Sequence, residues 1–275
     1  MSAFKSLVGR HLLVSFFLLA YALTWLGAIP YSLGVFEAPL LPLGPFLAAL
    51  IVASLGGGWS ATKSLLLRMV QWRVARRWYA LALLLPVAIL VCAIYANVLY
   101  GAPAPSGDFM LQALPGIVPI FAFALLFPLS GAFGEELGWR GFALPRLLAD
   151  RSPLAASLIL GLLVAIWHAP LFVTGMYGDA PLRILSMVAL TMVFTLLANG
   201  SGGSVLLAML FHAGLNAWPE LVIPAFSGTD LERLMRLYAI VSIAAGVVAA
   251  VVGGRRFARR TAPHTAHVVT APVAA

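Results

Sequence analysis

Long uncharged apolar runs, separated by short clusters of charged residues, dominate the hydrophobic pattern of this 275-residue chain. A helix needs about 20 apolar residues to cross the hydrocarbon core of a bilayer. The runs are continuous, whereas the strands of a membrane barrel alternate between apolar and polar positions. We therefore predict an all-α polytopic bundle of about eight transmembrane helices. The predicted spans are residues 12–33, 40–58, 78–100, 115–133, 153–174, 183–199, 203–219 and 236–253.

The sixth and seventh predicted spans are divided by a turn and not by a charged loop. Residues 199–203 read Asn-Gly-Ser-Gly-Gly, in the middle of a long stretch without charge. So much glycine with short polar side chains favours a turn over a continuous helix. The sixth span, 183–199, and the seventh, 203–219, are consequently the shortest of the set.

Composition supports the assignment to a membrane. Hydrophobic residues make up 62% of the chain and charged residues 9%, whereas an ordinary soluble domain carries about 25% charged residues. A soluble fold of this size could not cover so much apolar surface. The net charge of +8 would suggest nucleic acid in a soluble protein. Here the basic residues lie between apolar runs, so we expect membrane lipid as a partner and no nucleic acid.

Positive charges separate to one side of the predicted bundle. Eight spans place both termini on the same side, and fourteen of the seventeen Lys and Arg residues fall there. Only Arg183, Arg233 and Arg236 fall on the opposite side. Because Lys and Arg mark the cytoplasmic side of a membrane protein, we predict a multi-pass protein of the cell membrane with both termini in the cytoplasm.

The chain is organised as one domain. We expect residues 1–260 to form a single membrane-embedded domain, with a motif core over 133–219. Residues 261–275 contain Ala, Thr, Pro, Val and His without periodicity, so we predict a disordered tail. Residues 59–77 mix basic and apolar side chains, and they fit either an amphipathic helix on anionic headgroups or a basic loop.

The first group of candidate functional residues is Glu135, Glu136 and Arg140, at the cytoplasmic end of the fourth predicted span. Glu136 and Arg140 are four residues apart, so they share a helical face and are expected to pair. Glu135 points about 100° away from Glu136 on a helix, which leaves it available to a pocket. Taken alone, the group fits an ordinary ion pair at a solvated helix end equally well.

Two further groups come from other spans. His168 lies well inside the fifth predicted span, and His212 and Asn216 lie four residues apart on one face of the seventh. Singly, such residues often serve packing or interhelical hydrogen bonds. Together they are more informative, because polar side chains inside a membrane usually face the bundle interior, pair with one another and serve function.

These side chains supply the groups that amide hydrolysis needs. A glutamate in an apolar pocket can act as a general base near neutral pH, and His and Asn can donate hydrogen bonds to a developing oxyanion. A glutamate and two histidines are also a competent zinc set with an open fourth position. Metal-assisted and metal-free activation of water therefore both stay open. The sequence contains no phosphate-binding loop, no His-Glu-x-x-His and no Gly-x-Ser-x-Gly.

At these motifs the chain resembles the CPBP family of intramembrane peptidases, also called the CAAX protease and bacteriocin-processing or Abi family. The family pattern is Glu-Glu-x-x-x-Arg, then Phe-x-x-x-His, then His-x-x-x-Asn, on separate membrane helices. The first and third motifs are complete here, whereas the second has Val164 at the aromatic position. The motifs cover residues 135–216, and the predicted helix count extends the resemblance to nearly the whole chain.

The resemblance implies roles for the polar residues. Glu135, with His168, would activate the attacking water. His212 and Asn216 would form the oxyanion hole. Substrates would be membrane-associated or lipid-modified proteins or peptides, which makes the implied activity that of an intramembrane endopeptidase.

The resemblance also implies residues that orient the site and residues that could bind a metal. Glu136 and Arg140 would orient the site, with Glu136 supporting His168. The family is commonly labelled metalloprotease, although a metal-free glutamate mechanism is also proposed for it. If a metal is bound, the implied ligands are Glu135, His168 and His212, and zinc is the natural ion for this set.

Two other classes of function remain open at this point. A proton-coupled transporter would use intramembrane Glu and His as a proton relay, but no internal repeat is evident in the sequence. A non-catalytic immunity or binding protein could use the same scaffold, although buried charges without a use are costly.

Overall fold

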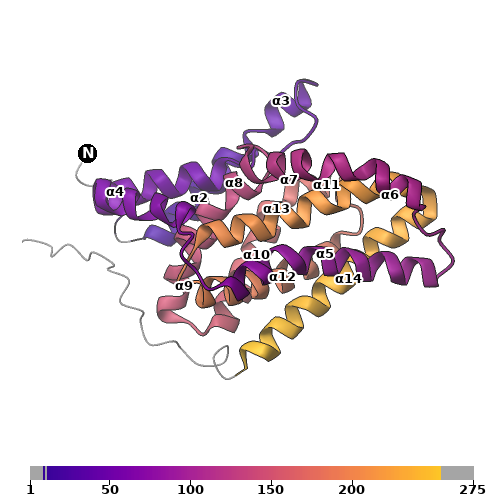
Figure 1. Ribbon diagram of the computed structural model, residues 1–275. Coiled ribbons are helices and arrows are strands. Elements are labelled where there is room, and N and C mark those ends of the chain that lie inside the picture. Colours follow the sequence, from indigo (N-terminus) through magenta and orange to yellow (C-terminus); the bar gives the residue numbers. More distant parts are fainter. Residues whose placement is uncertain (1–8, 10, 255–275) are drawn as a thin grey trace, which may run out of the picture.

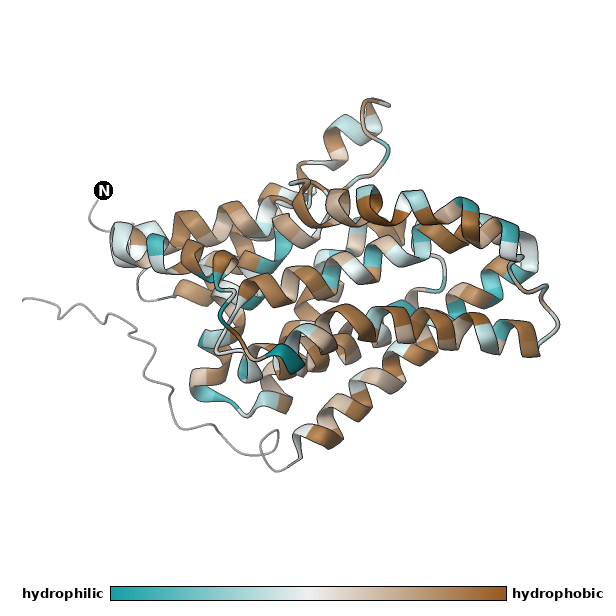
Figure 2. Cartoon of the chain, in the orientation of Figure 1, coloured by the Kyte–Doolittle hydropathy of each residue, from teal (hydrophilic) through white to brown (hydrophobic). Residues whose placement is uncertain are grey.

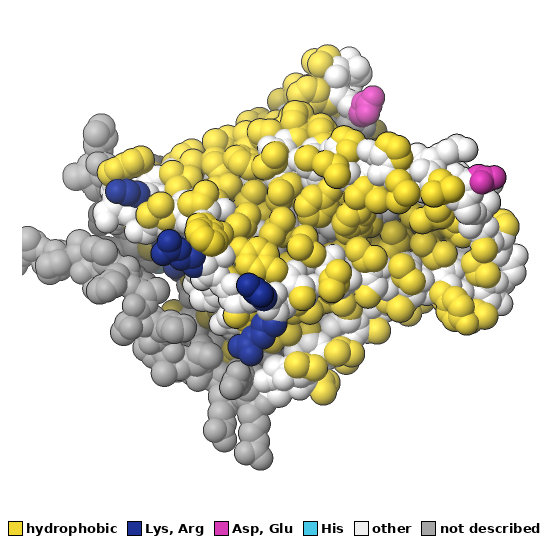
Figure 3. All heavy atoms as spheres, viewed as in Figure 1, with side chains coloured by type: hydrophobic (Ala, Val, Ile, Leu, Met, Phe, Trp, Pro, Cys, Tyr) yellow, Lys and Arg dark blue, Asp and Glu magenta, His cyan; other side chains and the backbone are white. Residues whose placement is uncertain are grey.

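The computed structural model describes residues 9 and 11–254. Every regular element in that part of the chain is a helix, and no strand occurs there, which confirms the predicted all-α bundle (Figure 1). Apolar residues predominate along the ribbon (Figure 2) and over the visible surface (Figure 3), as expected where lipid is the solvent. The tail predicted over residues 261–275 lies outside the described residues.

The helices follow one another with few connecting residues. In chain order they are α2 (Leu12–Trp25), α3 (Ala28–Ser32), α4 (Gly44–Leu67), η1 (Arg68–Val70), α5 (Arg76–Leu99), α6 (Gly107–Ala113), η2 (Leu114–Gly116), α7 (Ile117–Leu126), α8 (Ala132–Glu136), η3 (Leu137–Ala143), α9 (Leu144–Asp150), α10 (Pro153–Trp167), α11 (Ala169–Val173), α12 (Ala180–Gly200), α13 (Val205–Val222), η4 (Ile223–Ala225) and α14 (Gly228–Gly253). Of these, η3 is a π-helix, and η1, η2 and η4 are 3₁₀ turns.

Seven helical segments of the described chain are long and apolar enough to cross a membrane: Leu12–Ser32, Gly44–Val70, Arg76–Leu99, Gly107–Leu126, Ala180–Gly200, Val205–Ala225 and Gly228–Gly253. They correspond to seven of the eight predicted spans. The fifth predicted span, 153–174, is shorter than expected, because α10 has 15 residues and ends at Trp167. The structure therefore gives an integral membrane bundle with seven long apolar segments and one short one.

The fourth predicted span, 115–133, is wrong in its extent. The membrane segment runs from Gly107 to Leu126, and Phe127 is already extended. Pro128 follows Phe127, and the residue before a proline is biased away from the helical conformation. The chain starts a new helix only at Ala132. Figure 1 shows α7 and α8 as separate helices.

Residues 59–77 are first helical and then a loop, and the placement of the helical part on anionic headgroups stays a prediction. The α4 helix continues to Leu67 past a kink at Gly58, whose φ is 64°. Residues 71–75 form a loop that leads to α5. On the face seen in Figure 3, Lys and Arg side chains gather at this end of the molecule and acidic ones lie away from it. The orientation of the termini stays a prediction.

The predicted turn over residues 199–203 is confirmed. Helix α12 ends at Gly200 and α13 begins at Val205. Ser204 caps α13, because its Oγ accepts a hydrogen bond from the Leu207 N–H at 3.4 Å. The Asn-Gly-Ser-Gly-Gly sequence thus ends α12 and leads through Ser204 into α13.

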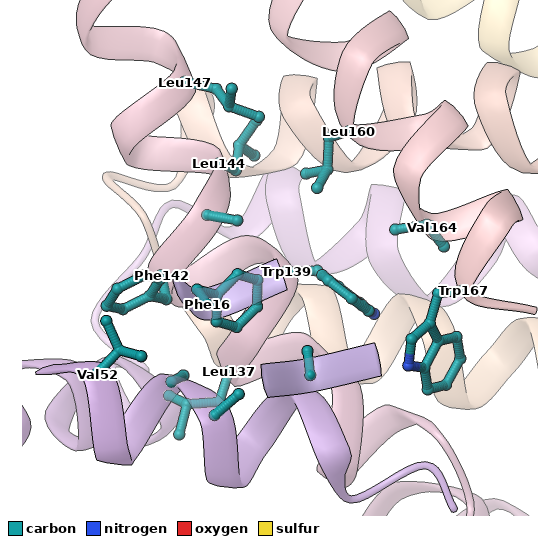
Figure 4. Packing of buried hydrophobic residues seen from close by; sticks show 14 of the residues in the cluster. Phe16, Val52, Leu137, Trp139, Phe142, Leu144, Leu147, Leu160, Val164 and Trp167 are labelled. Atoms are coloured by element: carbon teal, nitrogen blue, oxygen red, sulfur yellow. The ribbon is translucent and has the colours of Figure 1, made fainter. Parts of the chain in front are cut away.

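The largest buried cluster packs the N-terminal helices against η3 and α10 (Figure 4). The ring of Trp139 lies 5.5 Å from that of Phe16 and 5.6 Å from that of Trp167, both edge to face. Phe142 lies 5.0 Å from Phe16. Such pairs contribute about 0.5–1.5 kcal/mol each beyond the area they bury. The rings therefore fix η3, and with it the segment that contains the paired glutamates.

Two glycines one helical turn apart let α8 and η3 approach the start of α4. A Cβ at Gly134 would lie 2.6 Å from the Pro42 carbonyl oxygen, and one at Gly138 would lie 2.6 Å from that of Pro45. Small residues allow such close backbone contact between membrane helices. This contact and the aromatic cluster hold the α8–η3 segment from two sides.

A buried polar contact joins α5 to α14 and supplies a test of the fold. Asn97, fully buried, donates to the Asp230 carbonyl at 3.0 Å and accepts from Arg233 Nε at 2.7 Å. Asn97→Ala should lower the thermal unfolding midpoint, because unpaired buried groups cost about 1–3 kcal/mol. The exposed 3.9 Å pair of Glu232 and Arg236 gives the control: Arg236→Ala should leave the midpoint nearly unchanged. Equal midpoints for the two variants would contradict this contact.

Candidate active site

The break between α7 and α8 leads directly into the polar centre of the bundle. Ser130 Oγ donates to the Ala124 and Phe127 carbonyls, both at 2.7 Å, and thereby closes the end of α7. Gly131, with φ 94° and ψ −62°, then turns the chain into α8, and its carbonyl accepts from the Glu135 N–H at 2.8 Å. Residues with a side chain are strained at this φ, so glycine suits the turn.

Glu136 is the centre of a buried ion-pair network. Its Oε1 accepts from Arg140 Nη1 at 3.0 Å and from His212 Nδ1 at 2.6 Å. The predicted pairing of Glu136 with Arg140 is therefore confirmed. Glu136 is fully buried and Arg140 is 5% exposed, so water screens the network little. The Arg140 guanidinium also lies 3.6 Å from the centre of the Phe194 ring, a cation–π contact from α12.

The expected support of His168 by Glu136 is not what the structure shows. Glu136 holds His212 instead, because α13 packs against α8 and brings His212 to the carboxylate. His168 finds a different partner on its own helix. The paired glutamates also lie on the separate short helix α8, and not at the end of the fourth span where the sequence placed them.

Glu135 stays apart from Arg140, as its position on the helix predicted. Its Oε2 accepts a hydrogen bond from Trp139 Nε1 at 3.2 Å, and the side chain is 5% exposed. The indole is itself fixed by the aromatic cluster of Figure 4. Trp139 thus holds Oε2, and the other carboxylate oxygen, Oε1, is turned towards the Gly131 backbone.

Polar atoms from α8 and α13 converge on the space beside Gly131. A methyl group on Gly131 would lie 3.0 Å from Glu135 Oε1, 3.2 Å from His212 Nε2 and 3.4 Å from Asn216 Nδ2. The Asn216 amide donates to the Ser130 carbonyl at 3.1 Å and keeps a second N–H, because its nitrogen carries two protons. His212 is 16% exposed and Asn216 is exposed, so the space can be reached from outside the protein.

His168 joins α10 to α11 and does not lie well inside a membrane span as predicted. Helix α10 ends at Trp167, and His168 has φ −78° and ψ 4°. Pro170 follows two residues later, has no N–H to donate, and its ring crowds the preceding turn. The helix is interrupted there, which places the His168 side chain at a helix junction.

The hydrogen bonding of His168 leaves its outer nitrogen available. Nδ1 lies 2.9 Å from the Val164 carbonyl oxygen, which can only accept, so Nδ1 carries a proton and Nε2 can accept or bind. The contact uses the backbone of Val164, so the missing aromatic side chain of the second motif leaves it intact.

Three contacts of the site were not predicted. They are the hydrogen bond from Trp139 to Glu135, the Phe194 ring over Arg140, and the Tyr177 ring 5.5 Å from that of His168. Trp139 follows Glu135 by four residues, and this spacing on a helix could have indicated the contact. Phe194 and Tyr177 come from other segments, and no local pattern marks them.

The arrangement does not supply a preformed zinc site. Within the described part of the chain, no three His, Cys, Asp or Glu side chains are grouped so that they could hold a metal ion. Of the ligands implied by the resemblance, Glu135 and His212 face a common space, whereas His168 is held by Val164. Zinc binding therefore stays a prediction, and the side chains of the site contain the groups that metal-free hydrolysis would need.

Trp139 provides a test of how Glu135 is oriented. Trp139→Phe should keep the ring packing but remove the donor to Glu135 Oε2, so we expect kcat for peptide cleavage to fall about 10-fold with KM nearly unchanged. Trp78→Phe is the matched control, because the buried Trp78 Nε1 has no hydrogen-bond partner among the described residues. Equal kcat values for the two variants would show that the indole N–H does not orient Glu135.

Comparisons with known proteins agree with this site. Residues 116–218 match the family described as type II CAAX prenyl endopeptidase Rce1-like, a range that contains all the predicted site residues. The chain is 26% identical over 231 residues to the CAAX prenyl protease 2 of Methanococcus maripaludis, covering 76% of this chain and 83% of that protein. Together with the fold, these matches define the class as an intramembrane protease. Within that class, both matches support the resemblance to the CPBP, or CAAX protease, family that the motifs indicated. Neither match favours a transporter or a non-catalytic binding protein.

Proposed function

We propose that the protein is an endopeptidase that hydrolyses membrane-associated protein or peptide substrates with a water molecule activated by Glu135. One observation carries the proposal: Glu135 Oε1, His212 Nε2 and Asn216 Nδ2 face the same small space beside Gly131. A carboxylate base opposite two hydrogen-bond donors is the arrangement that amide hydrolysis requires.

Glu135 acts first as a base and then as an acid in this proposal. Its Oε1 takes a proton from water as the water oxygen bonds to the peptide carbonyl carbon. The tetrahedral intermediate then collapses, the C–N bond breaks, and Glu135 gives the proton to the departing amine. Trp139 holds Oε2 and so keeps Oε1 turned to the reacting water. His168 assists through Nε2, the nitrogen that its bond to Val164 leaves available.

His212 and Asn216 stabilise the oxyanion that forms on the carbonyl oxygen. Asn216 offers its second amide proton. His212 donates from Nε2 when the ring carries both protons, a state that the Glu136 carboxylate at Nδ1 stabilises by ion pairing. Loss of one such donor typically costs about 10²–10³-fold in kcat. Glu136 and Arg140 touch no reacting atom in this scheme and serve to position His212.

The surroundings of the site support a substrate anchored in lipid. Phe127 and Leu129, in the break just before Ser130, are 42% and 41% exposed. An apolar rim next to a polar centre suits a chain that arrives from the membrane with apolar side chains or an attached lipid. The relative from M. maripaludis is named a prenyl protease, and a lipid-modified substrate is therefore one of two classes to test here.

Cleavage in liposomes tests the proposal. Two quenched fluorescent peptides serve as probes: one with an S-farnesyl cysteine four residues from its C-terminus, and one unmodified peptide with a single apolar span. We expect the purified protein to cleave at least one of them, and the choice identifies the substrate class. Metal analysis of the same preparation tests whether zinc accompanies the activity. Cleavage of neither probe would contradict the proposed function.

A further inference from the structure

Polar atoms of Glu135, His212 and Asn216 lie around Gly131, the glycine of the turn before α8. Gly131 is buried, yet the three polar atoms lie closer to the position of a methyl group on Gly131 than packed atoms usually do. Those atoms would lie 3.0, 3.2 and 3.4 Å from a methyl carbon. A carbon beside an oxygen normally keeps about 3.3–3.6 Å, so a methyl would crowd the Glu135 and His212 side chains.

The three polar atoms that line this space can all bind an oxygen atom. Hydrogen bonds to oxygen span about 2.5–3.2 Å, and Glu135 can accept while His212 and Asn216 can donate. A water oxygen would lie about 2 Å further from the Gly131 Cα than a methyl carbon would, because a Cα–H···O contact is about 3.3–3.6 Å long and a carbon–carbon bond about 1.5 Å. A methyl group at residue 131 would therefore overlap a water held there. The side chain missing at residue 131 thus leaves room for one oxygen among three groups that can bind it.

Backbone conformation alone does not account for this environment. Gly101, in the turn after α5, has φ 95°, almost the same as the 94° of Gly131. A Cβ on Gly101 would meet nothing within 4 Å, whereas one on Gly131 would meet three polar side-chain atoms. The two glycines therefore share the requirement for a positive φ, and only Gly131 also borders the polar centre.

We propose that Gly131 is a positioning residue that keeps the place of the reacting oxygen open between Glu135, His212 and Asn216. The inference rests on the proposed function, since it concerns the water that Glu135 activates and the oxyanion that follows. The turn before α8 thereby takes part in catalysis. Gly131 supplies no reacting group, but its lack of a side chain leaves room for the water.

The experiment compares Gly131→Ala with Gly101→Ala, using whichever liposome probe the unaltered protein cleaves. We expect Gly131→Ala to lower kcat about 100-fold, because small displacements of reacting groups cost that much, and to leave KM within about 3-fold, since the peptide-binding surface is unaltered. Gly101→Ala should keep kcat within about 2-fold. Both variants carry the backbone penalty of a positive φ, and Gly131→Ala also crowds Glu135 and His212. Its thermal unfolding midpoint should therefore fall at least as far as that of Gly101→Ala, with the protein still folded.

Each other outcome overturns the inference. If Gly131→Ala keeps its kcat while Glu135→Gln loses it, the space beside Gly131 does not hold the reacting oxygen, and the proposed function stands. If Gly131→Ala unfolds while Gly101→Ala does not, the space is packed and not open. If the loss is in KM and not in kcat, Gly131 serves peptide binding. Retention of cleavage by Glu135→Gln would instead remove the proposed function itself.

Discussion

Replacing Glu135 with glutamine should abolish peptide cleavage and leave the fold intact. Glutamine has the same shape and its amide oxygen can still accept from Trp139 Nε1, but an amide cannot take a proton from water. General base catalysis contributes about 10²–10⁴-fold, and the same carboxyl group returns the proton to the amine. We therefore expect kcat in liposomes to fall at least about 10³-fold, with a thermal unfolding midpoint equal to or above that of the unaltered protein, because one buried charge is removed.

The control for this variant is a carboxylate on the surface of the same bundle. Glu232→Gln changes an exposed side chain on α14, a helix that contributes no residue to the site. Its cleavage rate should stay within about 2-fold of the unaltered protein, since exposed substitutions away from a site have small effects. A Glu135→Gln protein that cleaves as fast as the Glu232→Gln protein would reject Glu135 as the base.

Removing the neighbouring carboxylate, by contrast, should damage stability and activity together. Glu136→Ala leaves the buried Arg140 guanidinium without its partner and frees the His212 ring. Loss of one member of a buried ion pair costs about 3–5 kcal/mol, so we expect the thermal unfolding midpoint in detergent to fall by roughly 6 °C or more. Cleavage should fall about 10²-fold or more, because His212 is no longer held at the site.

A double substitution separates the two effects of Glu136. Glu136→Leu combined with Arg140→Met replaces the charged pair with apolar side chains of similar size, a change that is often neutral for stability. The midpoint should therefore recover most of the loss seen in Glu136→Ala. Cleavage should not recover, because His212 Nδ1 still lacks its acceptor. Recovery of cleavage in the double variant would show that Glu136 supplies stability alone.

Features set by local sequence could be predicted, and those set by packing could not. The continuous apolar runs indicated the bundle, and the glycine-rich sequence after Asn199 indicated the turn between α12 and α13. The four-residue spacing of Glu136 and Arg140 indicated their pairing. In each case the relevant partners lie within one or two helical turns of one another in the chain.

The interruption before α8 left no local mark in the hydrophobic pattern. Residues 127–131 contain no charge and continue an apolar stretch, so they were assigned to the fourth span. The helix ends there because of Pro128 and because Gly131 takes a positive φ. Hydropathy measures transfer into lipid and carries no information about backbone direction, so the break and the new helix could not be found from it.

The partner of Glu136 was missed for a related reason. Glu136 could have reached His168 or His212, and both belong to distant segments. The choice depends on how helices pack: α13 contacts α8 directly, and the interruption at Pro170 places His168 at the α10–α11 junction. Separate helices can be expected to share a polar centre, but which imidazole meets which carboxylate follows from the packing alone.

The proposed function requires one spatial arrangement: polar groups from distant helices face a space inside the apolar bundle that water can reach. Charged methanethiosulfonate reagents modify thiols in water and not in lipid, so thiol accessibility tests this arrangement most directly. A cysteine introduced as Asn216→Cys, in a Cys92→Ala background, should react in membranes, and a bound probe peptide should slow the reaction. The native Cys92, exposed on the apolar surface of α5, should stay unmodified in the unaltered protein. A thiol at residue 216 that is as inert as Cys92 would contradict this arrangement.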